Sequence, residues 1–284
     1  MAKRRRSRID VHLHLSQYWP DLRTNSYRPD LDFSTRSLLR ELDAQGIERG
    51  ILLQINDSPS VEETLREASK FFEESQGRLL QTSTVDPTRG VEEVRRAIAL
   101  WEKVPSLVAL KLYPGYQHFY PHDRRLDELY EFAHRRGIPV MIHQGDTLNP
   151  LGFLKFARPV EVDEVTVRYR DVRFVLCHLG NPWIDEAAEV VFKNENAYAD
   201  SSGLLANPKV PYFSRMVERS RRRIAAFIEY VGSSDRLLYG SDWPLLSIKT
   251  AVSLIDGLKL PVEDRERILG GNARQLYRLE KFSS

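Results

Sequence analysis

The segment Arg8-Ile9-Asp10-Val11-His12-Leu13-His14-Leu15 alternates apolar and polar side chains with a period of two. This period predicts a β-strand, in which residues i and i+2 point to the same side. His12 and His14 then converge on one spot, and Asp10 shares their face at a deeper position. Two converging imidazoles form half of a ligand set for zinc or a similar divalent ion. Two histidines held by ordinary hydrogen bonds would give the same pattern, so the metal interpretation depends on further ligands downstream.

The remainder of the chain repeats a strand followed by a helix. The segment 47–55 is nearly all apolar at its centre, which indicates a strand buried on both faces and therefore parallel pairing. The predicted strands are 8–15, 47–55, 78–85, 107–113, 138–143, 172–178, 197–201 and 236–242. Eight strands in 284 residues, each followed by a helix, predict a closed (β/α)8 TIM barrel of the α/β class.

The composition is that of an ordinary globular protein. The 42 basic and 40 acidic residues leave a net charge of +2, so no general nucleic-acid footprint follows. We predict a basic N-terminal arm over residues 1–8 and a single barrel domain over 9–284; contact of the arm with nucleic acid or a membrane surface is the alternative. A single cysteine excludes an intrachain disulfide and favours a cytoplasmic protein. No apolar run approaches the roughly 20 residues of a membrane span.

Polar side chains gather at the ends of the predicted strands. In barrels of this kind the active site lies at the C-terminal ends of the strands. These ends carry His12, His14, Lys111, Tyr113, His143, His178 and Asp242. Imidazole and carboxylate are ligands that zinc takes, so the four histidines and the aspartate predict a metal site. The common nucleotide-binding motifs GxGxxG and GxxxxGK[ST] are absent.

Six short segments together resemble a known family. They are IDVHLH at 9–14, LKLYP at 110–114, VMIH at 140–143, VLCHLG at 175–180, YGSDWP at 239–244 and GNAR at 271–274. In this order the set is similar to the amidohydrolase-related family, the superfamily branch that includes aminocarboxymuconate semialdehyde decarboxylase. The resemblance implies a barrel of the metal-dependent hydrolase type with one divalent metal, usually zinc. By motif position it implies the metal ligands His12, His14, His143 and Asp242, with Asp242 and His178 as catalytic residues.

The sequence also departs from that family around the expected pocket. Many relatives have His at the position of Tyr113, Thr at that of Gln144 and a small residue at that of Cys177, so the substrate stays open. Lys111 raises a further question, because a carboxylated lysine on strand four bridges two metals in other branches. The sequence context favours contact of Lys111 with a substrate anion or a structural role near the metal.

Residues in the loops complete the predicted substrate site. Trp19 and Trp243 follow the first and last strands and could form an apolar pocket wall beside Lys111 and Tyr113; packing at an interface is the alternative.

Polar residues at the ends of strands six and seven can be explained by structure as well as by function. Cys177 alternates to the face opposite His178, so we expect a packed small residue rather than a nucleophile. Asp200 and Ser201 end strand seven, where either a substrate contact or a structural hydrogen bond is consistent with the pattern.

These features predict a metal-dependent hydrolase. In this interpretation, water activated by the metal attacks a carbonyl of an ester, lactone or amide. The alternative is a nonoxidative metal-dependent decarboxylase of an unsaturated or aromatic carboxylic acid. No arginine at a strand end is available to bind a carboxylate, which favours hydrolysis. A barrel that has lost catalysis and binds a partner through its basic arm is a third interpretation. We expect a small-molecule substrate, neither a nucleic-acid nor a membrane partner, and a homodimer as the candidate assembly.

Overall fold

The computed structural model describes residues 8–18, 31–55, 59–205 and 209–282. Within these residues eight parallel strands form one sheet, and their order in space is their order along the chain. The strands are β1 (Arg8–Leu13), β2 (Ile47–Leu52), β3 (Leu79–Thr84), β4 (Leu107–Leu112), β5 (Val140–Ile142), β6 (Phe174–Leu176), β7 (Ala197–Asp200) and β8 (Leu237–Leu238). This is the TIM-barrel arrangement that the sequence predicts.

The first and last strands are joined at a seam just beyond β8. The backbone N–H of Asp242 donates to the carbonyl oxygen of His12 at 2.9 Å. The buried carboxyl group of Asp10 reinforces the seam, because its Oδ1 accepts from the N–H of His12 at 3.1 Å and of Ser241 at 3.0 Å. The seam therefore fixes the segments that carry His12 and Asp242 relative to each other.

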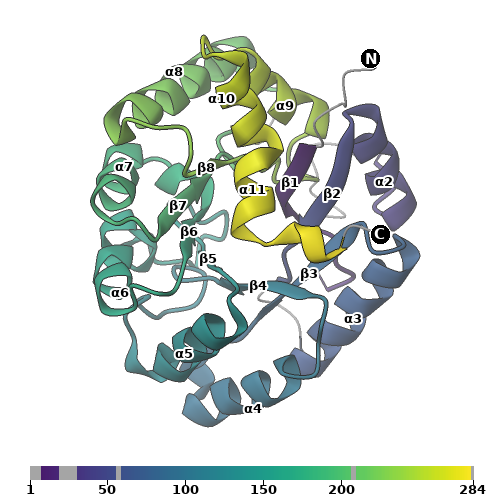
Figure 1. The fold of residues 1–284 in the computed structure, drawn as a ribbon, viewed down its shortest axis with the longest axis vertical. Helices are drawn as coiled ribbons and strands as arrows, with labels where there is room; N and C mark the ends of the chain where they lie inside the picture. Colours follow the sequence, from purple (N-terminus) through teal and green to yellow (C-terminus); the bar gives the residue numbers. More distant parts are fainter. Residues whose placement is uncertain (1–7, 19–30, 56–58, 206–208, 283–284) are drawn as a thin grey trace.

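Helices surround the barrel and cover its outer side (Figure 1). They are α2 (Thr35–Ala44), α3 (Val61–Glu74), α4 (Val91–Trp101), α5 (Asp127–Arg136), α6 (Asp163–Arg168), α7 (Ile184–Lys193), α8 (Phe213–Val231) and α9 (Ile248–Asp256). The side chains of Ser34 and Ser60 cap α2 and α3 by accepting backbone N–H groups of the first turn.

The apolar core has two parts, one between the strands and the helices and one inside the barrel. Neighbouring residues of a strand alternate between them, as a period of two requires. On β5, for example, Val140 and Ile142 belong to the outer part and Met141 to the inner part. A residue that follows Ile142 in extended backbone therefore points inward, which is the position of His143.

The C-terminal segment closes the end of the barrel at which the strands begin (Figure 1). It contains α10 (Val262–Glu266) and α11 (Asn272–Leu276). Asn272 Nδ2 donates to the carbonyl oxygen of Leu237, the first residue of β8, at 2.8 Å. Leu276 and Tyr277 pack into the inner core. The opposite end of the barrel is where the strand-end polar residues gather.

The last strands are shorter than the sequence predicts. The predicted strand 172–178 ends as β6 at Leu176, because His178 and Leu179 adopt positive φ angles of 61° and 49°. The predicted strand 236–242 is reduced to Leu237–Leu238, and Asp242 also has a positive φ, of 60°. Both departures from extended backbone occur at residues of the predicted site.

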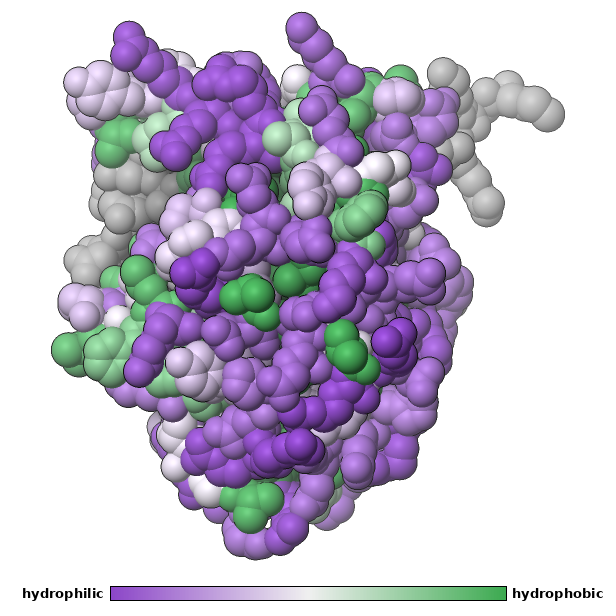
Figure 2. Space-filling view, turned by 90° about the vertical axis from the view of Figure 1, so that its left-hand side faces the viewer, coloured by the Kyte–Doolittle hydropathy of each residue, from purple (hydrophilic) through white to green (hydrophobic). Residues whose placement is uncertain are grey.

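One face of the outer surface is largely polar. Figure 2 shows a mainly hydrophilic face with scattered hydrophobic residues on the side that carries α6 and α7. None of the helices in the described ranges combines the length and the apolar character needed to cross a bilayer. Of the predicted basic arm, residues 1–7 lie outside the described residues, and Arg8 is the first residue of β1.

Candidate metal centre

His12, His14 and Asp242 meet at the open end of the barrel, beside the seam. The Nε2 atoms of His12 and His14 lie 3.5 Å and 3.4 Å from Oδ1 of Asp242. His178, just after β6, joins this cluster: it offers a ligand atom within 4.8 Å of those of His12 and Asp242. All four side chains are buried.

His143 completes the set of strand-end histidines. Its ring centroid lies 5.0 Å from that of His178. His143 Nε2 lies 3.0 Å from the carbonyl oxygen of Asp146, which can only accept, so Nε2 carries the proton and Nδ1 the lone pair. Among the described residues, two groups have ligand atoms that all lie within 4.8 Å of one another, and neither contains His14 or His143. The structure thus gathers the predicted ligands at one rim, and one of the two groups joins His178 to His12 and Asp242.

The donor atoms of this rim fit a divalent cation. Nδ1 of His12 donates to Oδ2 of Asp200 at 2.9 Å, so Nε2 of His12 holds the lone pair. That Nε2 is buried and has no hydrogen-bond partner within the part of the chain that the structure describes. A carboxylate that accepts from one ring nitrogen while the other faces a cluster of ligands is the usual environment of a metal-binding histidine.

Asp200 and Ser202 connect the histidines from the end of β7. Oδ1 of Asp200 accepts from the backbone N–H groups of His178 at 3.1 Å and Ser202 at 3.0 Å, and from the Ser202 hydroxyl. The Ser202 oxygen also lies 2.8 Å from Nδ1 of His178 and 3.0 Å from Nδ1 of His12. The sequence analysis left the role of Asp200 open and missed Ser202. The only signal was the run Asp-Ser-Ser-Gly at the end of a predicted strand.

Burial sets the protonation states of the site. It lowers the pKa of His178 to about 3, with the nearby His12 adding to the effect. Burial, followed by His178, lowers the pKa of His143 well below its ordinary value. Burial alone would raise the pKa of Asp242, but the hydrogen bond from His14 and the charge of His12 hold it below its ordinary range. At neutral pH His143 and His178 are therefore neutral imidazoles and Asp242 is a carboxylate, the forms that bind metals.

The backbone of the site is held in an unusual conformation. His178 and Asp242 have φ angles of 61° and 60°, in the left-handed region that residues other than glycine seldom adopt. Such conformations cost about 1–3 kcal/mol each and cluster at functional sites. Gly203, with φ +64°, lies against the His178 ring so closely that a Cβ there would be 2.4 Å from Nδ1. The ring can occupy its place only because residue 203 has no side chain.

Lys111 and Cys177 form a buried pair inside the barrel. Lys111 Nζ donates to Cys177 Sγ at 2.9 Å and lies 5.0 Å from the centroid of the Tyr113 ring. The sequence analysis expected Cys177 to face away from His178, and this is wrong. Cys177 belongs to the inner core, and its Sγ lies within 4.8 Å of ligand atoms of His12 and Asp200. The positive φ of His178 breaks the alternation on which that expectation depended.

The aromatic residues that the sequence analysis assigned to the substrate pocket do not all lie at the site. Trp243 is fully buried outside the barrel interior, stacked on Phe33 at 5.5 Å with its Nε1 donating to Glu41. This is a core position, so the prediction of a pocket wall is corrected for Trp243. The Tyr113 hydroxyl donates to the carbonyl oxygen of Gln54, while its ring lies 6.5 Å from that of His143. Trp19 lies outside the described residues.

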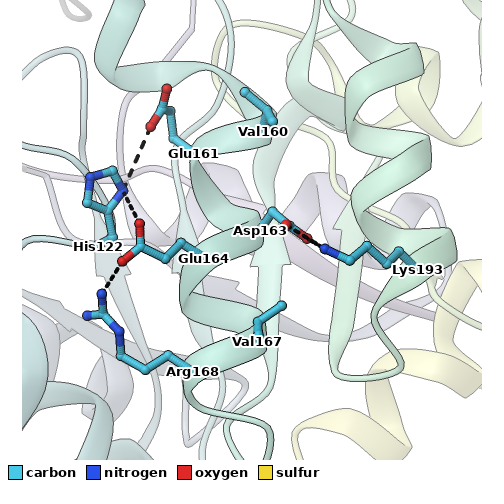
Figure 3. Close-up of a pocket in the computed structure, with 8 residues that line it drawn as sticks. All are labelled: His122, Val160, Glu161, Asp163, Glu164, Val167, Arg168 and Lys193. Atoms are coloured by element: carbon cyan, nitrogen blue, oxygen red, sulfur yellow. Dashed lines mark hydrogen bonds and ion pairs between the residues drawn. The ribbon is translucent and has the colours of Figure 1, made fainter.

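A separate hollow of about 650 Å³ lies on the outer surface along α6 and α7 (Figure 3). Its charged groups pair with one another: His122 Nδ1 lies 3.8 Å from Glu161 and 3.7 Å from Glu164, and Lys193 pairs with Asp163 at 2.6 Å. None of the predicted site residues lines it. The hollow is therefore distinct from the rim of histidines.

A TIM barrel with a rim of histidines and aspartate at its strand ends defines the class of metal-dependent barrel enzymes. The chain belongs to the amidohydrolase family, whose model matches residues 9–279.

Comparison with individual proteins extends this assignment. Gamma-resorcylate decarboxylase of Polaromonas sp. strain JS666 is 24% identical over 320 residues, which cover 93% of this chain and 91% of that protein. An uncharacterised TIM-barrel protein of Bordetella bronchiseptica superposes with a TM-score of 0.73 at 22% identity, over 96% of this chain and 98% of the other. A dihydroxybenzoic acid decarboxylase of Polaromonas sp. JS666, solved with manganese and 2-nitroresorcinol, gives a TM-score of 0.71 at 16% identity, over 96% and 97%.

The prediction of a hydrolase is wrong. The gamma-resorcylate decarboxylase, which aligns with 93% of this chain, and the dihydroxybenzoic acid decarboxylase named above support the decarboxylase alternative that the sequence left open. The preference for hydrolysis came from the lack of a strand-end arginine. The structure shows another basic side chain, Lys111, buried inside the barrel.

Proposed function

We propose that the protein is a metal-dependent, nonoxidative decarboxylase of an aromatic acid that carries a hydroxyl group beside its carboxylate. The observation that carries the proposal is the position of two proton-accepting groups, Asp242 and His178, within 4.8 Å of each other at a rim that fits a cation. The match to a gamma-resorcylate decarboxylase along 93% of the chain supports the choice of an aromatic acid.

The residues that would hold the metal are His12, His14, His143 and Asp242. A divalent ion bound there supplies positive charge that orients and polarises the substrate oxygens. Imidazole and carboxylate together suit zinc and manganese, and manganese is the ion in the Polaromonas decarboxylase structure. We propose one divalent ion per chain, with zinc and manganese as the two candidates.

The protonation states of the chain's own groups explain the need for a hydroxyl on the substrate. The carbon that loses carbon dioxide has to take up a proton in its place. At neutral pH Asp242 is a carboxylate and His178 a neutral imidazole, so each begins as a proton acceptor. A phenolic hydroxyl can give its proton to one of them, and the protonated group then delivers it to the ring carbon. The product regains its phenolic proton from water.

Lys111 is the proposed contact for the substrate anion. Its Nζ lies inside the barrel, and the thiol of Cys177 is the hydrogen-bond partner that the structure gives it. An ammonium group has three N–H donors, so two remain to bind a carboxylate or phenolate oxygen. The Tyr113 ring, 5.0 Å from this Nζ, would lie beside the same part of the substrate.

Carbon dioxide release tests the proposal directly. Protein loaded with zinc or manganese is incubated with mono- and dihydroxybenzoates and, as a matched control, with unsubstituted benzoate. We expect release only from acids with an adjacent hydroxyl. In D2O, deuterium should appear at the vacated carbon, and labelled water should leave no oxygen in the product. Loaded protein that releases no carbon dioxide from any hydroxybenzoate refutes the proposal.

A further inference from the structure

We infer that Ser202 and Asp200 are positioning residues that fix the proton of the neutral His178 ring on Nδ1 and turn its Nε2 lone pair toward the reacting groups. This inference deepens the proposed function, on which the catalytic role of His178 rests.

The assignment follows from counting hydrogens around one hydroxyl group. Ser202 has a single O–H, and it donates to Oδ1 of Asp200. Toward Nδ1 of His178, 2.8 Å away, the Ser202 oxygen can then only accept. Nδ1 of His178 therefore carries the hydrogen, and the lone pair of the neutral ring is on Nε2.

The opposite arrangement, with the Ser202 hydroxyl donating to His178, is disfavoured by the surroundings of Asp200. A carboxylate is a stronger acceptor than a neutral imidazole nitrogen, so the hydroxyl donates to Oδ1 of Asp200. His12 imposes no competing demand, because its Nδ1 is a donor to Oδ2 of Asp200 at 2.9 Å. Every hydrogen in the network then has an acceptor.

The two oxygens of Asp200 consequently serve two different histidines. Oδ2 orients His12, a proposed metal ligand, and Oδ1 acts on His178 through the hydroxyl of Ser202. When Nε2 of His178 accepts a proton, the new charge is connected through Ser202 to a buried carboxylate. A catalytic triad uses the same logic, in which a carboxylate orients a histidine and stabilises its protonated form.

The packing leaves the His178 ring little freedom to adopt another orientation. Asp200 is fully buried, and Ser202 is 1% exposed. The face of residue 203 that a side chain would occupy is filled by the His178 ring, whose Nδ1, Cγ and Cε1 all lie within 3.2 Å of the position of a Cβ. Loss of the Ser202 hydroxyl would therefore remove the acceptor of Nδ1 from a ring that the packing against Gly203 holds in place.

The tautomer is measured directly by NMR of the full-length protein with 15N-labelled histidine, in the metal-free state. His178 is assigned by the loss of its signals in His178→Gln. We expect the wild-type His178 to show a protonated Nδ1. Ser202→Ala should lose this signature, and the neighbouring control Ser201→Ala should keep it. A protonated Nε2 in the wild type, or an unchanged spectrum in Ser202→Ala, overturns the inference.

Metal binding separates the two branches of the network. Asp200→Asn removes the carboxylate from His12 and should weaken zinc affinity, measured by chelator competition, about 10- to 100-fold. Ser202→Ala should keep zinc affinity within about twofold, because Nδ1 of His12 still donates to Asp200, and should lower kcat about tenfold through its effect on His178. An unchanged kcat in Ser202→Ala contradicts the positioning role.

The outcomes also distinguish this inference from the proposed function. If the wild type has Nδ1 protonated but decarboxylates no hydroxybenzoate, the proposed function fails and the hydrogen-bond assignment is supported. If the wild type decarboxylates and His178 carries its proton on Nε2, the positioning inference fails alone.

Discussion

Gly203→Ala should disable the site through one added methyl group. Gly203 has φ +64°, and a Cβ at this position would lie 2.4 Å from Nδ1 and 2.9 Å from Cγ of the His178 ring. Gly46 provides a matched control, because its φ is +65° and a Cβ there would meet nothing within 4 Å. Both substitutions place an alanine in the left-handed backbone region, but only the new Cβ at residue 203 would clash with a neighbouring side chain.

The magnitudes follow from these distances. An alanine in the left-handed region costs about 1–2 kcal/mol, so both variants should lose this much unfolding free energy. Carbon atoms pack best at about 3.5–4.0 Å, so the His178 ring has to move by roughly 1 Å in Gly203→Ala. Overpacking of this kind adds about 1–3 kcal/mol of destabilisation. A displacement of about 1 Å in a catalytic group can reduce the rate about 100-fold.

Two measurements check this prediction. Urea denaturation gives the unfolding free energies of wild type, Gly46→Ala and Gly203→Ala, and carbon dioxide release gives kcat. We expect Gly46→Ala to keep the wild-type kcat and Gly203→Ala to lose about 100-fold. Equal unfolding free energies and equal kcat values in the two variants would show that the ring does not depend on the empty space at residue 203.

Three further predictions concern the metal and the seam. His12→Ala and Asp242→Asn should each abolish turnover while circular dichroism shows an intact barrel; wild-type turnover in either variant contradicts the proposed site. Dialysis against a chelator should remove activity, and zinc or manganese should restore it, whereas full activity of the metal-free protein would exclude a metal role. Burial raises the pKa of Asp10 to about 7, so the folded carboxyl keeps a proton that the unfolded chain releases above pH 3.8. The stability contributed by Asp10 therefore falls as the pH rises from 3.8 to about 7. In metal-free protein we therefore expect the unfolding free energy of Asp10→Asn, minus that of the wild type, to increase from pH 3.8 to about pH 7. A difference that stays constant over this range would contradict the raised pKa of Asp10.

The barrel was predictable because its signals are local. Apolar strands alternate with helices along the chain, and Ser34 and Ser60, close in sequence to the helices that they cap, mark two of the helix starts. The gathering of His143 and His178 at one end also follows from sequence, since parallel strands bring their C-terminal ends together. Strand lengths were less predictable, because a positive φ at His178 or Asp242 is set by tertiary contacts.

The parts of the site that sequence analysis missed depend on contacts between strands. Ser202 is one of many serines in the chain, and its role appears only when β7 is placed beside His178 and His12. Cys177 was assigned to the wrong side because the next residue leaves extended backbone. Trp243 was assigned to the pocket because of its loop position, but its side chain packs against Phe33 outside the barrel interior.

The seam made by Asp10 with His12 and Ser241 has a consequence for biosynthesis. His12 leaves the ribosome early, whereas Asp242 is translated after all eight strands and most of the helices. A growing chain therefore lacks the complete donor set of the proposed metal site until the final strand docks against the first. If the proposed site is correct, the full set of ligands is available only in the completed barrel, so metal supply would act on the folded protein rather than on its folding intermediates.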